Sequence, residues 1–531
     1  MSDQTRRDFL RLSSLGMLSA GLGALGSWRL ASAADADPMG VPRAAAAGSR
    51  PNIIVVLADD FGYGDAHFLD PQYSKIPTPH MDRLAQQGMA FTDAHSPSAV
   101  CTPTRYGMLT GRYAWRTRLQ RGVLRPWDPP LISPGRPTLP GLLNEQGYHT
   151  AAIGKWHLGM GWPRQDKAVD FDRPITGGPT THGFDHYFGI DVPNQPPYTF
   201  INDDRVTQQP TDHFDVAGKD KERAAEMFVR QSGPMVQGWR FDQVLPTLTE
   251  KAVGYIDQRA KEQAPFFLYF ALTTPHEPVA PSERFKGKSG ISGVGDLIME
   301  TDWALGEIMA ALEKNGLAQN TLLIFTGDNG HCHYTEPEHF QRAGHRVSGP
   351  YRGMKADIWE GGHREPFVAR WPGVIQAGAR CDQTICLTDL FATCAALVGA
   401  ALPKTGAEDS VSFLPLFKGA DTAVRQTMVV HSTRGEFAIR DGNWLLALCP
   451  EPTPPGAARD NQPPGQLYDL AADPSQTTNL YVKHPEIVAR LLAALEKIVA
   501  DGRSTPGPAG KNDVAIDLWK APRAAAPPKG D

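Results

Sequence analysis

The 531-residue chain lacks several features that mark particular classes of protein. It has no run of lysine and arginine that could follow a phosphate backbone, and its 53 basic residues are outnumbered by 58 acidic ones. Its aromatic residues are spread along the chain and do not interleave with basic side chains. We therefore expect no nucleic-acid partner. Beyond the first 33 residues, no stretch is long and apolar enough to cross a bilayer, so we do not expect an integral membrane protein.

Cysteine is scarce as well. The six cysteines stand at positions 101, 332, 381, 386, 394 and 449, and their spacings match no zinc site. If Cys101 is reserved for chemistry, five remain, and an odd number cannot all form disulfides within one chain. A pairing of Cys381 with Cys386 stays open at this stage.

The N-terminal segment has the pattern of a bacterial export signal. Arg6 and Arg7 form a twin-arginine motif, which an apolar stretch rich in Gly, Ala and Leu follows, and residues 31–33 read Ala-Ser-Ala. We predict a signal peptide over residues 1–33, read by the twin-arginine export machinery, and a linker over 34–49. A membrane anchor is the alternative, but the apolar run is short and broken by glycine. The expected location is therefore periplasmic or secreted.

Residues 50–420 alternate between short apolar runs and amphipathic stretches, which is typical of a sheet covered by helices. Helices are expected at residues 248–263 and 293–314. Four of the apolar runs lead directly into polar groups: 53–58 into Asp59-Asp60, 150–153 into Gly154-Lys155-Trp156-His157, 266–272 into Thr273-Thr274-Pro275-His276, and 321–326 into Gly327-Asp328-Asn329. Since ligands bind at the carboxyl ends of strands in open α/β sheets, these groups are predicted to converge on one site.

The C-terminal part of the chain has a different character. Residues 428–431, 437–440, 444–448 and 466–470 read as short strands, with a hairpin turn at Asp441-Gly442-Asn443, and residues 485–499 read as an amphipathic helix. We predict an α+β subdomain over residues 421–503. The tail from 504 to 531, rich in Pro, Ala and Gly, is predicted to be disordered.

The most specific motif is Cys101-Thr102-Pro103-Thr104-Arg105. A lone cysteine is more often simply buried in a loop. Here, however, the Cys-x-Pro-x-Arg pattern continues into Gly107-Met108-Leu109-Thr110-Gly111-Arg112. With that continuation it resembles the signature of the type I, formylglycine-dependent sulfatases, an arylsulfatase-like family of the alkaline phosphatase superfamily. Thr104 departs from the usual serine but keeps the hydroxyl.

The resemblance extends from about Arg50 into the C-terminal part and implies a fold. The expected architecture is α/β, with a large mixed, mostly parallel sheet flanked by helices, as in alkaline phosphatase, and a smaller C-terminal antiparallel sheet with a helix. It also implies that a formylglycine-generating enzyme oxidises Cys101. The aldehyde hydrates to a geminal diol, in which one hydroxyl attacks sulfur and the other later expels sulfate.

The resemblance further implies a metal site. Asp59, Asp60, Asp328 and Asn329 would bind one calcium ion together with the group derived from Cys101. Carboxylate and amide oxygens are the ligands that such a hard cation prefers. The alternative is structural, with Asp59-Asp60 capping a helix and Asp328-Asn329-Gly330 forming a turn.

Five further residues are implied as catalytic. Arg105, Lys155 and Lys355 would form a cationic clamp on the sulfate group. His157 would lie beside the formylglycine hydroxyls, while His276, with Lys355, would protonate the departing alcohol. The structural alternatives are solvated lysines and histidines satisfied within loops.

The leading functional hypothesis is hydrolysis of sulfate esters, aryl or carbohydrate, to an alcohol and sulfate. Because the same architecture hosts other hydrolases, a phosphodiester or phosphonate monoester hydrolase with the same nucleophile is a rival. An inactive exported binding protein is another, although no core group is missing. A dinuclear zinc phosphatase would need more His and Asp ligands than the chain offers. A small aryl sulfate, an algal polysaccharide and a glycosaminoglycan fragment all stay open as substrates.

Overall fold

The computed structural model describes residues 50–166, 168–452 and 462–520. The predicted signal peptide and linker lie outside these described residues. Within them, no helix combines the length and the apolar character that spanning a bilayer requires.

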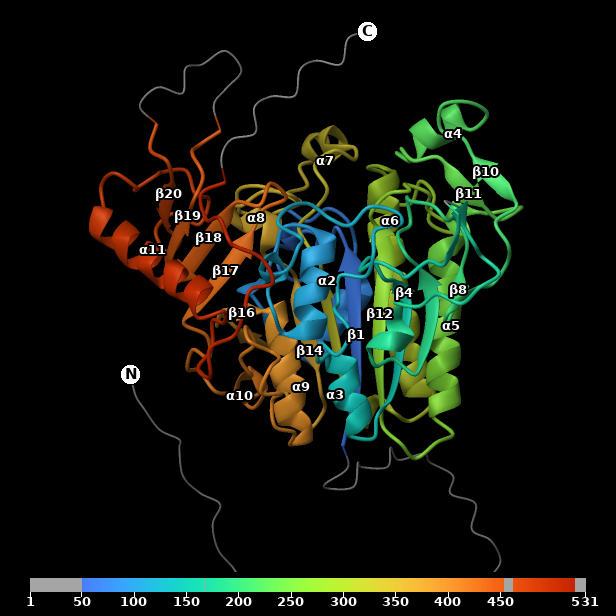
Figure 1. Ribbon diagram of the computed structural model, residues 1–531, viewed down its shortest axis with the longest axis horizontal. Helices are drawn as coiled ribbons and strands as arrows, with labels where there is room; N and C mark the ends of the chain where they lie inside the picture. Colours follow the sequence, from blue (N-terminus) through green and yellow to red (C-terminus); the bar gives the residue numbers. More distant parts are fainter. Residues whose placement is uncertain (1–49, 167, 453–461, 521–531) are drawn as a thin grey trace, which may run out of the picture. The chain divides into compact units, whose positions relative to one another are not determined.

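A ten-stranded mixed sheet forms the centre of the fold (Figure 1). Its strand order is β15-β2-β14-β13-β1-β12-β4-β7-β8-β9. In chain order these strands are β1 (Asn52–Asp59), β2 (Met89–Phe91), β4 (His149–Lys155), β7 (His186–Ile190), β8 (Ile201–Asn202), β9 (Arg205–Val206), β12 (Phe266–Pro275), β13 (Thr321–Gly327), β14 (Phe367–Arg370) and β15 (Ala379–Cys381). The central strands β13, β1, β12, β4 and β7 are mutually parallel, whereas β14 and β8 pair antiparallel with their inner neighbours.

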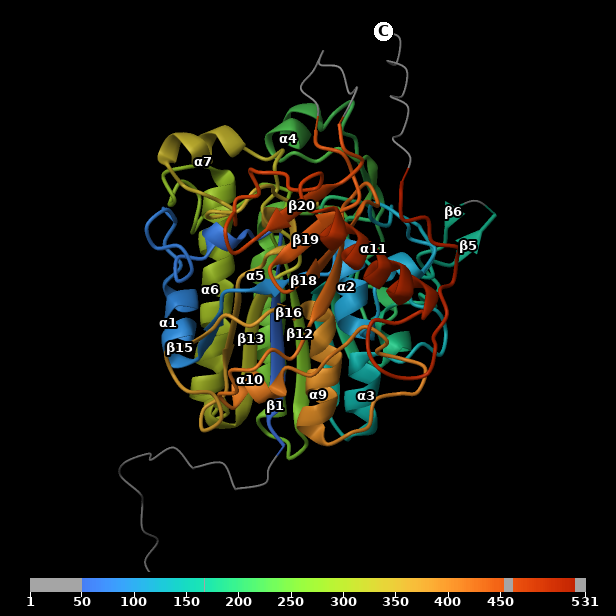
Figure 2. The same ribbon diagram turned by 90° about the vertical axis from the view of Figure 1, so that its left-hand side faces the viewer.

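Helices cover both faces of this sheet (Figure 2). The helices are α1 (Pro79–Gln87), α2 (Cys101–Thr110), α3 (Leu139–Glu145), α4 (Lys221–Glu226), α5 (Val244–Arg259), α6 (Gly293–Lys314), α7 (Pro337–Ala343), α8 (Glu360–His363), α9 (Leu390–Val398), α10 (Leu414–Phe417) and α11 (Pro485–Ala500). On one face lie α1, α5 and α6, and on the other α2, α3 and α9. Helix α6 matches its predicted bounds, whereas α5 begins and ends four residues before the prediction.

The strand β1 explains why the sequence shows unbroken apolar runs here. Ile53, Val55 and Leu57 pack into the core beneath α2, α3 and α9, while Ile54 and Val56 pack into the core beneath α1, α5 and α6. A strand with helices on both faces must be apolar at every position, so it shows no alternation with polar residues. The predicted fold class is confirmed by this arrangement.

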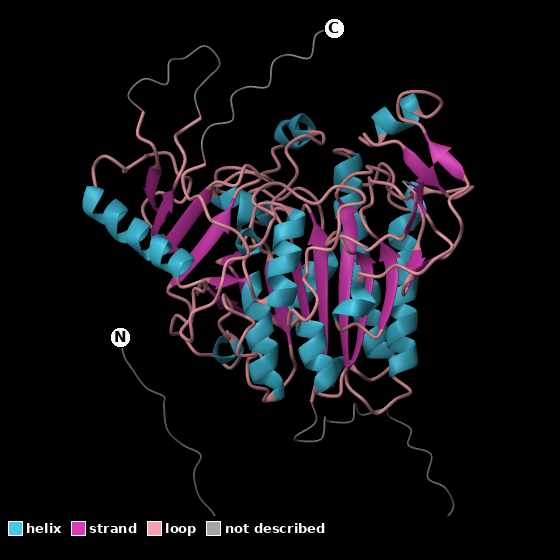
Figure 3. Ribbon diagram, in the orientation of Figure 1, coloured by secondary structure: helices cyan, strands magenta, loops and turns pink. Residues whose placement is uncertain are grey.

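A four-stranded antiparallel sheet forms the C-terminal part, separate from the large sheet (Figure 3). Its strands are β17 (Thr427–His431), β18 (Phe437–Asp441), β19 (Trp444–Ala447) and β20 (Gln466–Asp469), in that order. The remaining short strands form pairs: β3 (Ala94–His95) with β16 (Ile385–Cys386), β5 (Arg164–Gln165) with β6 (Ala168–Val169), and β10 (Asp212–Phe214) with β11 (Gly233–Met235). Tyr113 and Trp115, which follow α2, share one buried cluster with this sheet and α11.

The prediction of a disordered tail is wrong for residues 504–520. Arg112 donates to the backbone carbonyl of Lys511 at 2.7 Å and forms an ion pair with Asp513 at 3.0 Å. Arg116 donates to the side chain of Asn512 at 2.8 Å. Two buried arginines therefore fix a segment whose composition alone indicates disorder, because composition does not report contacts made with distant residues. Residues 521–531 lie outside the described part.

Candidate active site

The carboxyl ends of the parallel strands meet at the upper edge of the large sheet in Figure 1. Asp59 is the last residue of β1 and Lys155 the last of β4, while Asp328 directly follows β13. Backbone hydrogen bonds join the strand ends: Asp328 donates to Ala58 at 3.0 Å and His276 to Asp59 at 3.1 Å. The predicted convergence of these strand ends is therefore present in the fold.

Backbone geometry at this edge is unusual. Asp60 and His157 adopt the left-handed region, with φ of 66° and 54°, which non-glycine residues rarely occupy. Gly154 has φ of 116°, and a Cβ there would lie 1.8 Å from the carbonyl oxygen of Ala271 in β12. Only glycine permits this close approach, which sets the position of the adjacent Lys155. Such conformations cluster where a protein holds functional groups in place.

Three carboxylates pair with three cations at these strand ends. Lys155 Nζ lies 2.6 Å from Asp59 Oδ2, and Lys355 Nζ lies 2.7 Å from Asp60 Oδ2. Arg105 holds Asp328 Oδ2 with two donors, at 2.9 and 2.7 Å. All six side chains are buried, and their formal charges sum to zero.

This pairing governs the charge states of the carboxylates. Burial alone would raise the pKa of Asp59, but the attraction of Lys155, His276 and Arg105 outweighs it and keeps that pKa far below its ordinary value. Burial, followed by repulsion from Asp59, raises the pKa of Asp328 to about 6. Crowding several carboxylates together is therefore opposed by mutual repulsion, which a bound cation would relieve.

The donor set fits a hard divalent cation. Asp59 Oδ1 and Asn329 Oδ1 are buried acceptor oxygens with no hydrogen-bond partner, although Arg105 Nη2 lies 3.5 Å from Asp59 Oδ1 and the second side-chain atom of each residue is engaged. Ligand atoms of Asp59, Asp60, Cys101 and His276 lie within 4.8 Å of one another. Unpartnered buried oxygens cost free energy unless something binds them, and oxygen ligands are what calcium or magnesium requires.

Cys101 is the first residue of α2 and is 2% exposed. Burial raises the pKa of its thiol far above the ordinary value, although Lys155 and Lys355 act in the opposite direction. The thiol is therefore protonated at neutral pH and a poor nucleophile in this form. Thr104 donates its hydroxyl to the carbonyl of Ser98 at 2.9 Å, so the residue that departs from the family pattern helps to shape the turn before α2.

Two histidines face the same space with different hydrogen-bond arrangements. His276 Nδ1 lies 2.6 Å from the carbonyl oxygen of Glu277 and therefore carries a proton, and its Nε2 lies 3.8 Å from Asp60 Oδ2. His157 Nε2 donates to the carbonyl of Leu124 at 3.1 Å, which leaves Nδ1 without a partner. Burial, followed by Lys155 and Arg105, holds the pKa of His157 well below its ordinary value, so this ring is neutral.

These groups line a crevice of about 370 Å³, which we call the catalytic crevice. Of the predicted residues, Cys101, His157, His276 and Lys355 form its wall. Arg105 and Lys155 are absent from that wall and lie behind it, against Asp328 and Asp59. Loop residues also line the crevice: Asn194, Gln195, Glu277, His333 and Tyr334. On sequence grounds His333 has a weaker claim to acid–base chemistry than His157 and His276, and the other four carry no predicted role. Glu277 accepts hydrogen bonds from Asn194 at 2.8 Å and Tyr334 at 3.1 Å.

All six cysteines are buried and free, so the pairing of Cys381 with Cys386 left open above is not formed. Asp65 belongs to a separate buried polar cluster. Asp65 accepts from His331 and His345, each at 2.8 Å. Neither His331 nor His345 lines the catalytic crevice.

Comparison with known proteins gives a consistent picture. Residues 51–400 match the model of the family described as Sulfatase. The chain is 35% identical to the N-acetylgalactosamine-6-O-sulfatase of Bacteroides thetaiotaomicron, over 85% of this chain and 93% of that protein. It is 32% identical to arylsulfatase A of Homo sapiens, over 87% of this chain and 90% of that protein.

A solved structure gives the same result for the fold. It comes from work on the metabolism of multiple glycosaminoglycans by Bacteroides thetaiotaomicron. The two chains superpose with a TM-score of 0.75 at 33% identity, over 85% of this chain and 99% of the other.

Proposed function

This chain belongs to the sulfatase family of hydrolases that act on sulfate esters, and we propose that it uses a formylglycine made from Cys101 together with one calcium ion. The observation that carries the proposal is the meeting of Cys101 with Asp59, Asp60 and His276 within 4.8 Å in one buried cluster. Formylglycine would supply a hydroxyl nucleophile that the buried, protonated thiol cannot. The Cys-x-Pro-x-Arg motif at Cys101, which resembles the family signature, supports the modification.

Asp59, Asp60, Asp328 and Asn329 would hold the calcium ion, which supplies positive charge to offset that of the sulfate group. The unpartnered oxygens of Asp59 and Asn329 support this assignment. With the ion added, the balanced set of three carboxylates and three cations becomes positive. A singly charged sulfate ester would then enter a site of complementary charge.

The chain's own residues would divide the proton transfers. Neutral His157 has a free Nδ1 acceptor in the wall that Cys101 shares, so it can take a proton from the nucleophilic hydroxyl. His276 keeps one proton on Nδ1 through Glu277, so a second proton on Nε2 could pass to the departing oxygen. Lys355, in the same wall, would stabilise negative charge on that oxygen. Arg105 and Lys155 would act by positioning Asp328 and Asp59.

The relatives named as acting on N-acetylgalactosamine 6-sulfate and as arylsulfatases support an aryl or carbohydrate sulfate as the substrate. A crevice of about 370 Å³ fits a single ring of either kind. We also propose export to the periplasm or beyond, which rests on the twin-arginine motif at Arg6 and Arg7.

Mass spectrometry and a paired assay test this function. In protein made with the maturation enzyme, the peptide containing Cys101 should be about 18 Da lighter than the thiol form. The protein should hydrolyse 4-nitrophenyl sulfate with a higher kcat/KM than 4-nitrophenyl phosphate, and Cys101→Ala should reduce turnover by at least about a thousandfold.

Cys394→Ala, which removes a buried thiol from α9, is the matched control and should keep both turnover and the modification. A preference for the phosphate ester would favour the rival phosphoester hydrolase. An unmodified Cys101 in inactive protein would favour the binding protein.

A further inference from the structure

A second group of metal-ligating side chains lies outside the catalytic crevice, and we call it the histidine cluster. It consists of His95, the last residue of β3, and of Glu360 and His363, the first and last residues of α8. One ligand atom from each residue lies within 4.8 Å of the other two, and all three side chains are completely buried. None of them lines the catalytic crevice or has a role in the chemistry proposed above.

The two imidazole rings of the cluster face each other through the same nitrogen. His95 Nδ1 lies 3.1 Å from His363 Nδ1. His95 Nε2 lies 2.8 Å from Asp93 Oδ1, and His363 Nε2 lies 3.3 Å from the carbonyl oxygen of Ile358. Because both oxygens can only accept, each Nε2 carries the hydrogen and the two Nδ1 lone pairs point at each other. Two acceptors at this distance repel unless a proton or a metal ion lies between them.

The outer hydrogen bonds of the rings match those of metal-bound histidines. A histidine that binds a metal ion through one nitrogen usually donates its other N–H to a carboxylate or a backbone carbonyl, which fixes the ring. Asp93 and Ile358 are such acceptors. Burial lowers the pKa of His363 to about 3 and also lowers that of His95, so the rings are neutral, as metal ligands must be. The same burial disfavours an extra proton shared by the two rings.

Glu360 offers a third ligand atom. Its Oε2 accepts from Arg364 at 2.6 Å, whereas its Oε1 is buried and has no hydrogen-bond partner among the described residues. Two imidazole nitrogens and one carboxylate oxygen are a ligand set that binds zinc in other proteins, with water as the fourth ligand. Glu360 also lines a cavity of about 200 Å³, through which an ion and its water can reach the cluster.

The charges around the cluster balance one another. Arg364 and Arg440 approach Asp93 at 2.8 and 2.7 Å, and Arg440 lies 3.9 Å from Glu360. Arg440 also lies 3.0 Å from the Nε2 atom of the β3 histidine, but it donates to Asp93 Oδ1 at 2.8 Å. The two guanidinium groups are therefore offset by two carboxylates, and Asp382 adds a negative charge to the cavity wall. Neutral imidazole sets bind zinc without any charged ligand, so this balance suffices for a metal ion.

The cluster lies where several parts of the fold meet. Strand β3 pairs with β16, and Gly330, in the loop after β13, donates to the carbonyl of Gly362 in α8 at 3.1 Å. Helix α8 lies next to β18 of the C-terminal sheet (Figure 1), from which Arg440 reaches Glu360. An ion bound to the cluster would join β3 to α8 and so stabilise the contact between the two sheets.

We propose that His95, Glu360 and His363 form a structural site for a divalent transition-metal ion such as zinc. Two nitrogen ligands distinguish it from the calcium site, because calcium prefers oxygen ligands whereas imidazole suits zinc. The ion stabilises the fold and takes no part in bond cleavage. This inference is independent of the proposed sulfatase function, since it requires neither formylglycine nor turnover.

Zinc binding to the full-length protein, purified without a histidine tag and stripped of metals, tests the site. Titration calorimetry in excess calcium, which keeps the calcium site filled, should give about one zinc ion per chain with a Kd of about 1 µM or lower. X-ray absorption of the zinc-loaded wild type should show two imidazole ligands and no sulfur. This measurement needs no variant and therefore does not depend on the folding of one.

Three variants locate the binding. His95→Gln combined with His363→Gln should abolish the titration, and Glu360→Gln should raise the Kd by at least about tenfold. Zinc should raise the Tm of the wild type and leave that of the double variant unchanged. His213→Gln removes an exposed histidine from β10 and should bind zinc as the wild type does.

Three results would overturn the proposal. Wild-type protein that binds no zinc would leave a proton between the two rings as the occupant. Zinc binding that survives in the double variant, or that disappears in excess calcium, would place the ion elsewhere. An absorption spectrum without imidazole ligands would contradict the assigned residues. Hydrolysis of 4-nitrophenyl sulfate is measured separately, so a failure of the proposed function leaves each of these results interpretable.

Discussion

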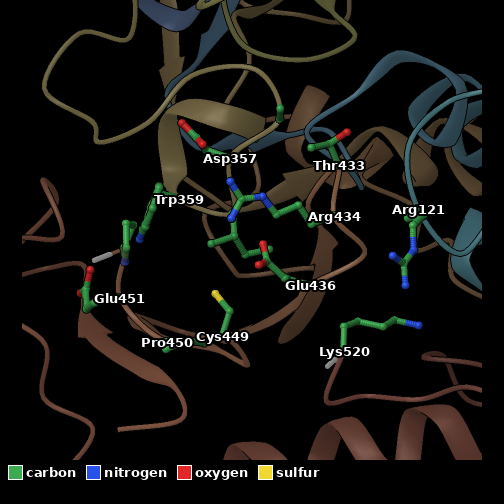
Figure 4. A pocket seen from close by; sticks show the side chains of 13 residues that line it. Arg121, Asp357, Trp359, Thr433, Arg434, Glu436, Cys449, Pro450, Glu451 and Lys520 are labelled. Atoms are coloured by element: carbon green, nitrogen blue, oxygen red, sulfur yellow. The ribbon is translucent and has the colours of Figure 1, made fainter. Parts of the chain in front are cut away.

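The catalytic crevice and a second cavity both gather positive side chains, but they hold them differently. Lys355 in the wall of the crevice and Lys155 behind that wall are buried, and each contacts a carboxylate within 2.7 Å. In the second cavity, of about 640 Å³, which we call the outer cavity (Figure 4), the side chains of Arg121 and Arg434 are exposed, and neither forms a hydrogen bond or a close ion pair with another described residue, although the Asp357 carboxylate in the same wall attracts Arg434. Paired buried cations are fixed in position, which chemistry at a reacting centre requires. Unpaired exposed cations remain available to a ligand.

The difference extends to the elements that carry these residues. Asp59, Lys155 and His276 stand at or directly after the ends of strands buried on both faces, where neighbouring backbone restricts movement. The outer cavity is built on loops between the strands of the C-terminal sheet. A rigid centre beside a loop-built surface allows the substrate preference to change while the chemistry is kept.

The largest effect should come from breaking a pair in the crevice. Lys355→Met leaves the buried carboxylate of Asp60 without its cation, so in the presence of EGTA the free energy of unfolding should fall by about 3–5 kcal/mol. Chemical denaturation measures this change. Turnover should fall as well, because Lys355 lines the crevice.

Two variants test whether pairing is the cause. Adding Asp60→Asn to Lys355→Met should recover part of the lost stability, since the uncompensated charge is removed. Arg434→Gln, which breaks no pair, should change the free energy of unfolding by less than about 0.5 kcal/mol. A loss at Arg434 as large as that at Lys355 would contradict the distinction between the two regions.

Calcium binding should have an intermediate effect on stability. It distinguishes the two regions because the proposed calcium ligands belong to the active site and not to the outer cavity. Calcium at a hundred times its dissociation constant should stabilise the protein by about 2.7 kcal/mol, seen as a rise in Tm by calorimetry. Chelation should lower turnover, and added calcium should restore it. Asp59→Asn should weaken the rise in Tm, whereas Arg434→Gln should not. A Tm that does not respond to calcium in wild-type protein would refute the metal assignment.

The smallest effect should come from removing the partly buried charge of Lys520, whose pKa burial lowers, with Asp517 opposing that shift and Arg121 adding to it. Because the folded-state pKa of Lys520 is lowered, its charged form is disfavoured in the folded protein. That destabilisation is fully present below the folded pKa and disappears as the pH rises through the unfolded pKa. Lys520→Met should therefore raise Tm slightly at pH 7 and less at pH 10. A lower Tm for the variant at pH 7 would show that Lys520 is satisfied by contacts within the protein.

Much of the site was readable from the sequence because its residues follow recognisable runs. Asp59, Lys155, His276 and Asp328 each come after an apolar run, and such runs predict buried parallel strands whose ends converge. Glu277 and Tyr334, which line the same crevice, stand in loops that carry no periodic signal. The sequence also could not show that Arg105 lies behind the crevice wall, against Asp328, whereas Lys355 lies in the wall. Each is simply a cation within a motif.

The sequence by itself determined the fold class, the strands that carry the acidic groups, and Cys101 as the distinctive residue, because hydrophobic periodicity and motif spacing are local properties of the chain. Only the tertiary structure decided which oxygens lack partners, which cations are paired, and that segment 504–520 is held against Arg112 and Arg116. The outer cavity belongs to the second group, since Arg121, Arg434 and Lys520 are far apart in sequence. Such juxtapositions depend on packing between distant elements, which no local pattern encodes.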